Sequence, residues 1–131
     1  MSEFHGMRVI VGCIAAGAIA PGHSVNLVSN SGGEKTVEQS HAVNTAWGVY
    51  IGEVAAAQYD HVEIVIFGLC KAWVDGAITL DPPQFLSNDG DGHIVAETAD
   101  KKRAIGVAAE DNGATENYAE IFVNTQLTSQ A

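Results

Sequence analysis

The chain has 131 residues, enough for one domain that buries about two thirds of its unfolded surface without a metal or a disulfide. Acidic residues outnumber basic ones by 16 to 6 and the formal net charge is −10, so the phosphate backbone of a nucleic acid would be repelled. Only 17% of the residues are charged, which favours a protein that covers part of its surface with partners.

The second half of the chain resembles the first half at a spacing of about 57 residues. The corresponding positions are Gly12 and Gly68, Asn30 and Asn88, Trp47 and Ile105, and Val62 and Ala119. Two copies at this period predict two small units around one core. We expect an N-terminal arm over 1–6, a single β domain over 7–124 with pseudo-repeats at about 7–67 and 68–124, and a C-terminal tail over 125–131.

In the first copy, apolar and β-branched residues over 7–14 predict a strand that is buried on both faces. Pro21-Gly22 indicates a turn, and the polar–apolar alternation over 24–28 predicts a strand with one exposed face. Asn30 to Gly33 favours a hairpin turn before a return strand over 34–38.

The rest of the first copy ends in the strongest strand of the chain. Residues 39–46 are too polar for the core, and 47–54 predict a further strand. A short connection over 55–59 leads into the apolar strand over 61–67.

The second copy repeats this order. Its predicted strands cover 69–74, 84–86, 93–97, 104–110 and 118–124, with turns at 81–83 and 88–92. No stretch carries the sustained 3.6-residue period of a long amphipathic helix. The predicted fold class is all-β: a compact β-barrel or β-sandwich built from two pseudo-repeated units of short strands, with little helix.

Two features of the apolar runs concern redox state and targeting. Cys13 and Cys70 lie near equivalent positions inside apolar runs, so we expect buried reduced thiols, with a disulfide bridge between the copies as the alternative.

Residues 7–20 are apolar and end in small residues, as the segment before a signal-peptide cleavage site does. Glu3 and the absence of a basic cluster before this stretch argue against a signal peptide. The stretch is also too short to span a membrane, so we expect no membrane partner.

The residue types used in catalysis form no recognisable constellation. The five histidines are scattered, with no His-x-His or His-x-x-x-His pair to place two imidazoles on one metal. The segment from Asn88 to Gly92 resembles the start of a calcium loop, but a tight hairpin turn explains the same residues. We therefore expect no catalytic residue, no cofactor and no metal ligand, and hence no enzyme.

The residues from Ala104 to Val123 carry a family resemblance. A strand with Ile105-Gly-Val-Ala, a loop bearing Asp and Ala, and a closing strand that alternates acidic and apolar residues resemble the capsid cement, or decoration, proteins of tailed bacteriophages. Segments 67–74 and 87–95 match the strand and hairpin that precede this unit, and 24–67 repeat it more loosely.

The resemblance implies a structural protein without a reaction to catalyse. Such a protein is made in the host cytoplasm and binds the outer surface of the assembled capsid in the virion. It usually does so as a homotrimer that bridges neighbouring subunits of the major capsid protein. The resemblance transfers no contact residues, and the polar stretch 34–46 departs from the family pattern.

From the residues themselves, the candidates for partner contact are aromatic: Phe4, Tyr59, Trp73 and Phe85. For Trp73, as for Trp47, a position in the core is the favoured alternative. The alternative function is a small ligand- or metal-binding β-barrel, or an enzyme on such a barrel, motivated by the histidines and the acidic loops. Two imidazoles converging in a pocket would favour that alternative.

Overall fold

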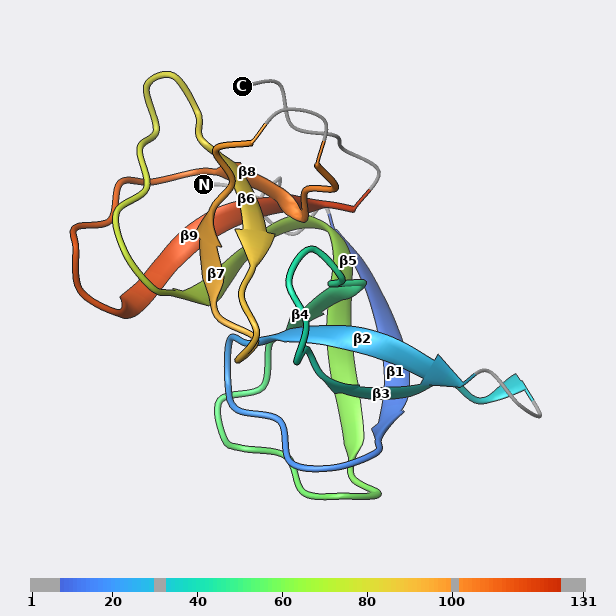
Figure 1. Ribbon diagram of the computed structural model, residues 1–131. Helices are drawn as coiled ribbons and strands as arrows, with labels where there is room; N and C mark the ends of the chain where they lie inside the picture. Colours follow the sequence, from blue (N-terminus) through green and yellow to red (C-terminus); the bar gives the residue numbers. More distant parts are fainter. Residues whose placement is uncertain (1–7, 30–32, 100–101, 126–131) are drawn as a thin grey trace, which may run out of the picture.

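A computed structural model describes residues 8–29, 33–99 and 102–125 (Figure 1). The strands are β1 (Val9–Ala15), β2 (Ser24–Ser29), β3 (Thr36–Gln39), β4 (Gly48–Tyr50), β5 (His61–Val74), β6 (Phe85–Asn88), β7 (Ile94–Ala96), β8 (Gly106–Ala108) and β9 (Asn117–Asn124). The described part contains no α-helix, so the predicted all-β class is confirmed. Within it, no helix is long and apolar enough to cross a membrane.

The strands form two closed five-stranded circuits that share β5. The first runs β1-β3-β2-β4-β5 and closes through the pairing of β1 with β5, and the second runs β5-β7-β6-β8-β9 and closes through the pairing of β5 with β9. The pairing of β1 with β3 in the first circuit and that of β5 with β7 in the second are parallel, and every other pairing is antiparallel. The sequence repeat therefore corresponds to a repeated barrel topology.

The boundary between the two copies lies inside β5. The sequence predicts two strands there, over 61–67 and 69–74, but the structure has one strand of 14 residues. Its first half pairs with β1 and β4, and its second half pairs with β7 and β9. Gly68 has a φ of 115°, which a residue with a side chain rarely adopts, and its neighbours keep their pairing with β9. The glycine thus lets β5 curve from one barrel into the other without a break (Figure 1).

Each barrel has its own apolar core. The largest buried side chains are Ile19, Val25, Val37 and Ile64 in the first barrel, and Ile78, Leu86, Ile94, Ile105 and Ile121 in the second. Burial of each such side chain contributes about 1.5–3 kcal/mol relative to exposure. Most of these side chains come from strands, and Ile19, Ile78 and Ile105 come from the connections between strands.

One cysteine lies in each core. Cys13 belongs to the first core and Cys70 to the second, and both are buried and unpaired, which confirms the expected thiols. Burial raises the pKa of the Cys70 thiol to about 12. The thiolate is the reactive form, so this cysteine acts as a small apolar side chain.

Three details of the sequence-based prediction were wrong. β1 is not buried on both faces, because Val9 is 48% and Ile10 39% exposed. The strand predicted over 47–54 is only three residues long. The polar stretch 39–46 contributes to the interior through Ser40 and Ala46, which are both buried.

Candidate functional site

The predicted contact residues lie in different parts of the structure. Phe4 lies outside the described residues. Tyr59, in the loop between β4 and β5, is 75% exposed. Trp73, in β5, and Phe85, at the start of β6, are half-buried. The Trp73 ring packs edge-on against Tyr118, with ring centroids 4.9 Å apart.

Tyr59 is held out to solvent by a tight turn. The backbone N–H of Asp60 donates to the carbonyl of Ala57, and the Asp60 carboxylate accepts from the N–H of Ala57. Tyr59 has a φ of 73°, which a type II turn requires at this position and which normally favours glycine. Its N–H donates to the carbonyl of Ala15, so the loop is fixed to the end of β1.

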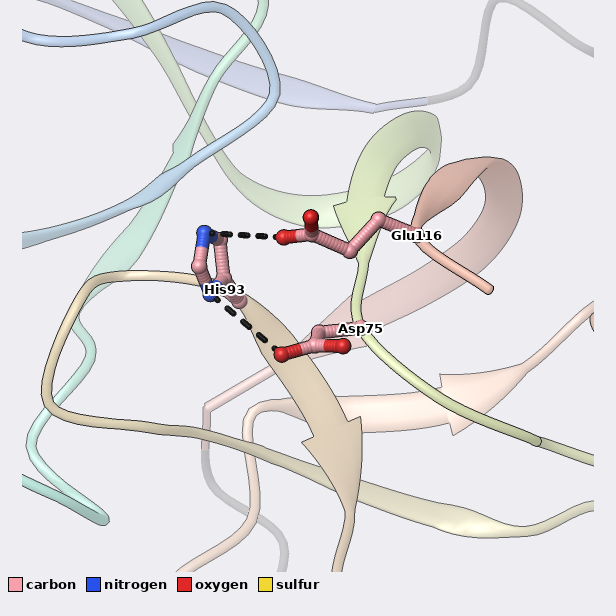
Figure 2. Close-up of side chains that lie close together, drawn as sticks. All are labelled: Asp75, His93 and Glu116. Atoms are coloured by element: carbon pink, nitrogen blue, oxygen red, sulfur yellow. Dashed lines mark ion pairs between the residues drawn. The ribbon is translucent and has the colours of Figure 1, made fainter. Parts of the chain in front are cut away.

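Polar side chains gather around His93 at the junction of the two barrels. Its Nδ1 lies 3.0 Å from Asp89 Oδ2 and 3.7 Å from Asp75 Oδ2, and its Nε2 lies 3.4 Å from Glu116 Oε1. Figure 2 shows Asp75 and Glu116 approaching different nitrogens of the ring. Three carboxylates from three segments of the second barrel therefore meet one imidazole.

His23 of the first barrel reaches the same place. Its ring contacts that of His93, with centroids 5.0 Å apart. The N–H of Trp73 donates to the carbonyl of Gly22, and the N–H of Ser24 donates to the carbonyl of Gly92. These two backbone bonds fix the segments on either side of the histidine pair.

The β6–β7 hairpin holds His93 in place. Asp89 Oδ1 accepts hydrogen bonds from the backbone N–H groups of Asp91 and His93, and Asp89 Oδ2 contacts the imidazole. The expected hairpin turn at 88–92 is confirmed by the pairing of Asn88 with Ile94. Asp89 thus both closes the turn and orients the His93 ring.

Burial affects the charge of His23. Desolvation of the half-buried ring is the largest effect on its pKa and lowers it from the ordinary value, and nearby His93 lowers it further. The carbonyl of Pro21, 3.0 Å from Nδ1, opposes this shift by favouring the protonated ring. The net direction is downward, so the neutral imidazole is favoured at neutral pH.

The His23→Asn variant should show a weaker dependence of stability on pH. In the unfolded chain His23 takes up a proton near its ordinary pKa of about 6.5, whereas the folded chain takes it up only at lower pH. The unfolded state therefore binds more protons in that window, and stability falls as the pH drops. The slope from one proton is below about 1.4 kcal/mol per pH unit. Urea unfolding at several pH values between 7.5 and 5.5 measures it. An unchanged slope in the variant would contradict this account.

This cluster could not be predicted from the sequence, because its members are far apart along the chain. His23 and His93 meet only because the turn at Gly22 packs against Trp73 of β5, where a Cβ on Gly22 would lie 2.8 Å from the Trp73 backbone nitrogen. Only the contact of Asp89 with His93 could have been predicted from the sequence, because residues that flank a tight hairpin turn face each other.

Two open grooves occur elsewhere on the described surface. One, of about 540 Å³, is lined by Arg8, Lys71 and Tyr118 among others. The other, of about 430 Å³, runs beside β1 and β5 and includes His61 and Glu63. The residues that line them do not include the His93 cluster or the predicted contact aromatics.

Comparison with known proteins gives a likeness in fold. No model of a known protein family matches the chain, and no curated protein matches its sequence. Among solved structures, the chain is similar to the N base of the head fiber gp8.5 in bacteriophage phi29, with a TM-score of 0.67 and 12% sequence identity. The likeness covers 95% of this chain and 100% of that chain. The chain therefore shares its all-β fold, over almost its whole length, with the base of a phage head fiber.

Proposed function

We propose that this chain is a structural protein of a phage virion that binds the outer surface of the capsid. The observation that carries the proposal is the likeness in fold to the base of a head fiber, which extends over 95% of the chain. The resemblance of residues 104–123 to capsid cement proteins supports the same role from the sequence. The proposal assigns the chain no reaction.

The partner that we propose is the major capsid protein, contacted at neighbouring subunits by a homotrimer. Each copy would bind the assembled lattice and not the free subunits, so binding stabilises the shell by mass action. Contacts repeated around a symmetry axis add avidity without any new kind of contact. The net charge of −10 would suit a basic rim on the capsid.

The experiment is cosedimentation of the purified protein with expanded capsids of its cognate phage, followed by calorimetry of the capsids. Binding together with a raised temperature of capsid disruption supports the bridging role. Binding without a raised temperature would leave an attachment role like that of a fiber base and reject bridging. The absence of binding would reject the proposal, and light scattering tests the trimer.

Tyr59 offers a test of the contact surface that leaves the fold intact. Tyr59→Gly removes an aromatic side chain that is 75% exposed and relieves a positive φ, so the free energy of unfolding should change by no more than about 1 kcal/mol. Capsid affinity should fall by about tenfold or more if the ring is a binding hot spot. Cosedimentation and urea unfolding measure the two effects.

Gln58→Gly is the matched control, because it loosens the same turn and keeps the aromatic ring. Gln58 is exposed, so this variant should bind capsids like the wild type. Equal loss of affinity in both variants would mean that the turn matters and the Tyr59 ring does not.

A further inference from the structure

The contacts of His93 are of two kinds. The distance from Nδ1 to Asp89 Oδ2 is 3.0 Å, within the usual range for a hydrogen bond. The distance from Nε2 to Glu116 Oε1 is 3.4 Å, which is longer than that range. Two ligand atoms bound at about 2.0–2.1 Å to a tetrahedral metal ion lie about 3.3–3.4 Å apart. The second contact has the spacing of two ligands on one ion.

The first contact prepares His93 for such a role. A metal-binding histidine usually donates its other ring N–H to a carboxylate, which fixes both the tautomer and the orientation of the ring. Asp89 does this at Nδ1 and is itself held by two backbone N–H groups, those of Asp91 and His93. The lone pair of the neutral ring then lies on Nε2, on the side of Glu116.

Glu116 is oriented too. The indole N–H of Trp73 makes a long hydrogen bond of 3.3 Å to Glu116 Oε1, just beyond the usual range, and the Trp73 ring packs on Tyr118. Ligand atoms of Asp75, His93 and Glu116 all lie within 4.8 Å of one another. Asp75 Oδ2 lies 3.7 Å from Nδ1, at the other ring nitrogen, so Asp75 has to change its side-chain torsions to reach an ion on Nε2, and its side chain is 45% exposed.

We propose that His93, Glu116 and Asp75 bind one divalent transition-metal ion at the junction of the two barrels, with Zn²⁺ as the probe. The imidazole selects against Ca²⁺ and Mg²⁺, which prefer oxygen ligands alone. The two carboxylates give the site negative charge, so a cation is favoured on charge. Side-chain exposures of 45% for Asp75 and 47% for Glu116 give the ion access from solvent.

A second set of possible ligands, Asp89, Asp91 and His93, shares the same imidazole. In that set Asp89 already accepts two backbone N–H bonds, and it engages His93 Nδ1 directly. Binding an ion there would break the contacts that close the hairpin. In the set with Glu116 the ion would bind Nε2, which Glu116 already approaches, and the hydrogen bonds of Asp89 that close the hairpin would stay intact.

The experiment is calorimetric titration of metal-free protein with Zn²⁺, together with melting curves. We expect one ion per chain, a rise in Tm of several degrees at saturation, and binding at least tenfold weaker in Glu116→Gln. Glutamine can still accept from Trp73, so this variant should fold. His93→Asn should lose binding while keeping a donor toward Asp89.

Two controls make the result specific to this site. His41→Ala removes an exposed histidine that pairs with Glu38, and it should bind Zn²⁺ like the wild type. Asp91→Asn should also leave the affinity unchanged. Loss of binding in Asp91→Asn with retention in Glu116→Gln would overturn the proposed ligand set. The same affinity in the wild type and in folded His93→Asn would overturn the site itself, and neither result depends on capsid binding.

Discussion

Replacing Gly106 with alanine is expected to lower the free energy of unfolding by about 3 kcal/mol or more. A Cβ at this position would lie 2.0 Å from the backbone oxygen of Phe122 and 2.9 Å from its carbonyl carbon. Gly106 pairs with Val123 in β9, and β8 is also paired with β6, so the backbone cannot move away on either side. Urea unfolding of the purified variant measures the loss.

The repeat supplies a second variant for the same test. Gly48 begins β4 as Gly106 begins β8, and a Cβ on Gly48 would lie 2.5 Å from the Ile64 side chain and 2.7 Å from the Val65 oxygen. Gly48→Ala should therefore be destabilising as well. Gly12→Ala is the control, because a Cβ there meets nothing within 4 Å. Equal stability of the Gly12 and Gly106 variants would contradict close strand packing as the reason for these glycines.

The Asn88→Ala variant should lose about 3–5 kcal/mol of stability. The buried Asn88 amide accepts from the N–H groups of Thr45 and Ala46, and it donates to the carbonyls of Ala42 and Asp89. Truncation leaves the N–H of buried Ala46 and that of half-buried Thr45 without this acceptor, and an unsatisfied buried group costs about 1–3 kcal/mol. The loop over 42–46 would also lose one of its anchors to the second barrel and keep those of the Asn44 side chain to Ser87, Glu97 and Arg103.

Asn117→Ala is the matched control, because Asn117 is exposed and, among the residues that the structure describes, its side chain bonds only the adjacent backbone N–H of Tyr118. Its effect should stay within about 0.5 kcal/mol. Urea unfolding of the two variants side by side gives the comparison. If Asn88→Ala were as stable as Asn117→Ala, the amide would not be what holds the loop.

The repeat was the most productive sequence feature, because spacing survives when side chains change. It predicted two units, and the structure repeats the same strand pairings in each. It misled at residues 67–69, where the boundary between copies was taken as a break between strands. Local patterning reports on the two faces of a strand and not on its edges, so it could not show that β5 serves both barrels.

The contacts of the polar loops were the hardest to predict from the sequence. Residues 39–46 have no apolar period, yet the Asn88 side chain holds 42–46 through three hydrogen bonds to backbone groups. Such bonds leave no trace in the sequence of the loop, because every residue offers the same N–H and C=O. The contact between His23 and His93 could not be predicted for a related reason. It depends on how the two barrels pack, and the chain between the two histidines spans most of both copies.

The shared strand also determines how this protein would carry a mechanical load. β5 is covalently continuous through both barrels and is paired along its length by β1 and β9. A pull on one barrel therefore reaches the other through a paired strand under shear, without a linker that could stretch or pivot. Neither barrel can unfold without removing a wall of the other, so tension should produce a single rupture event and not two.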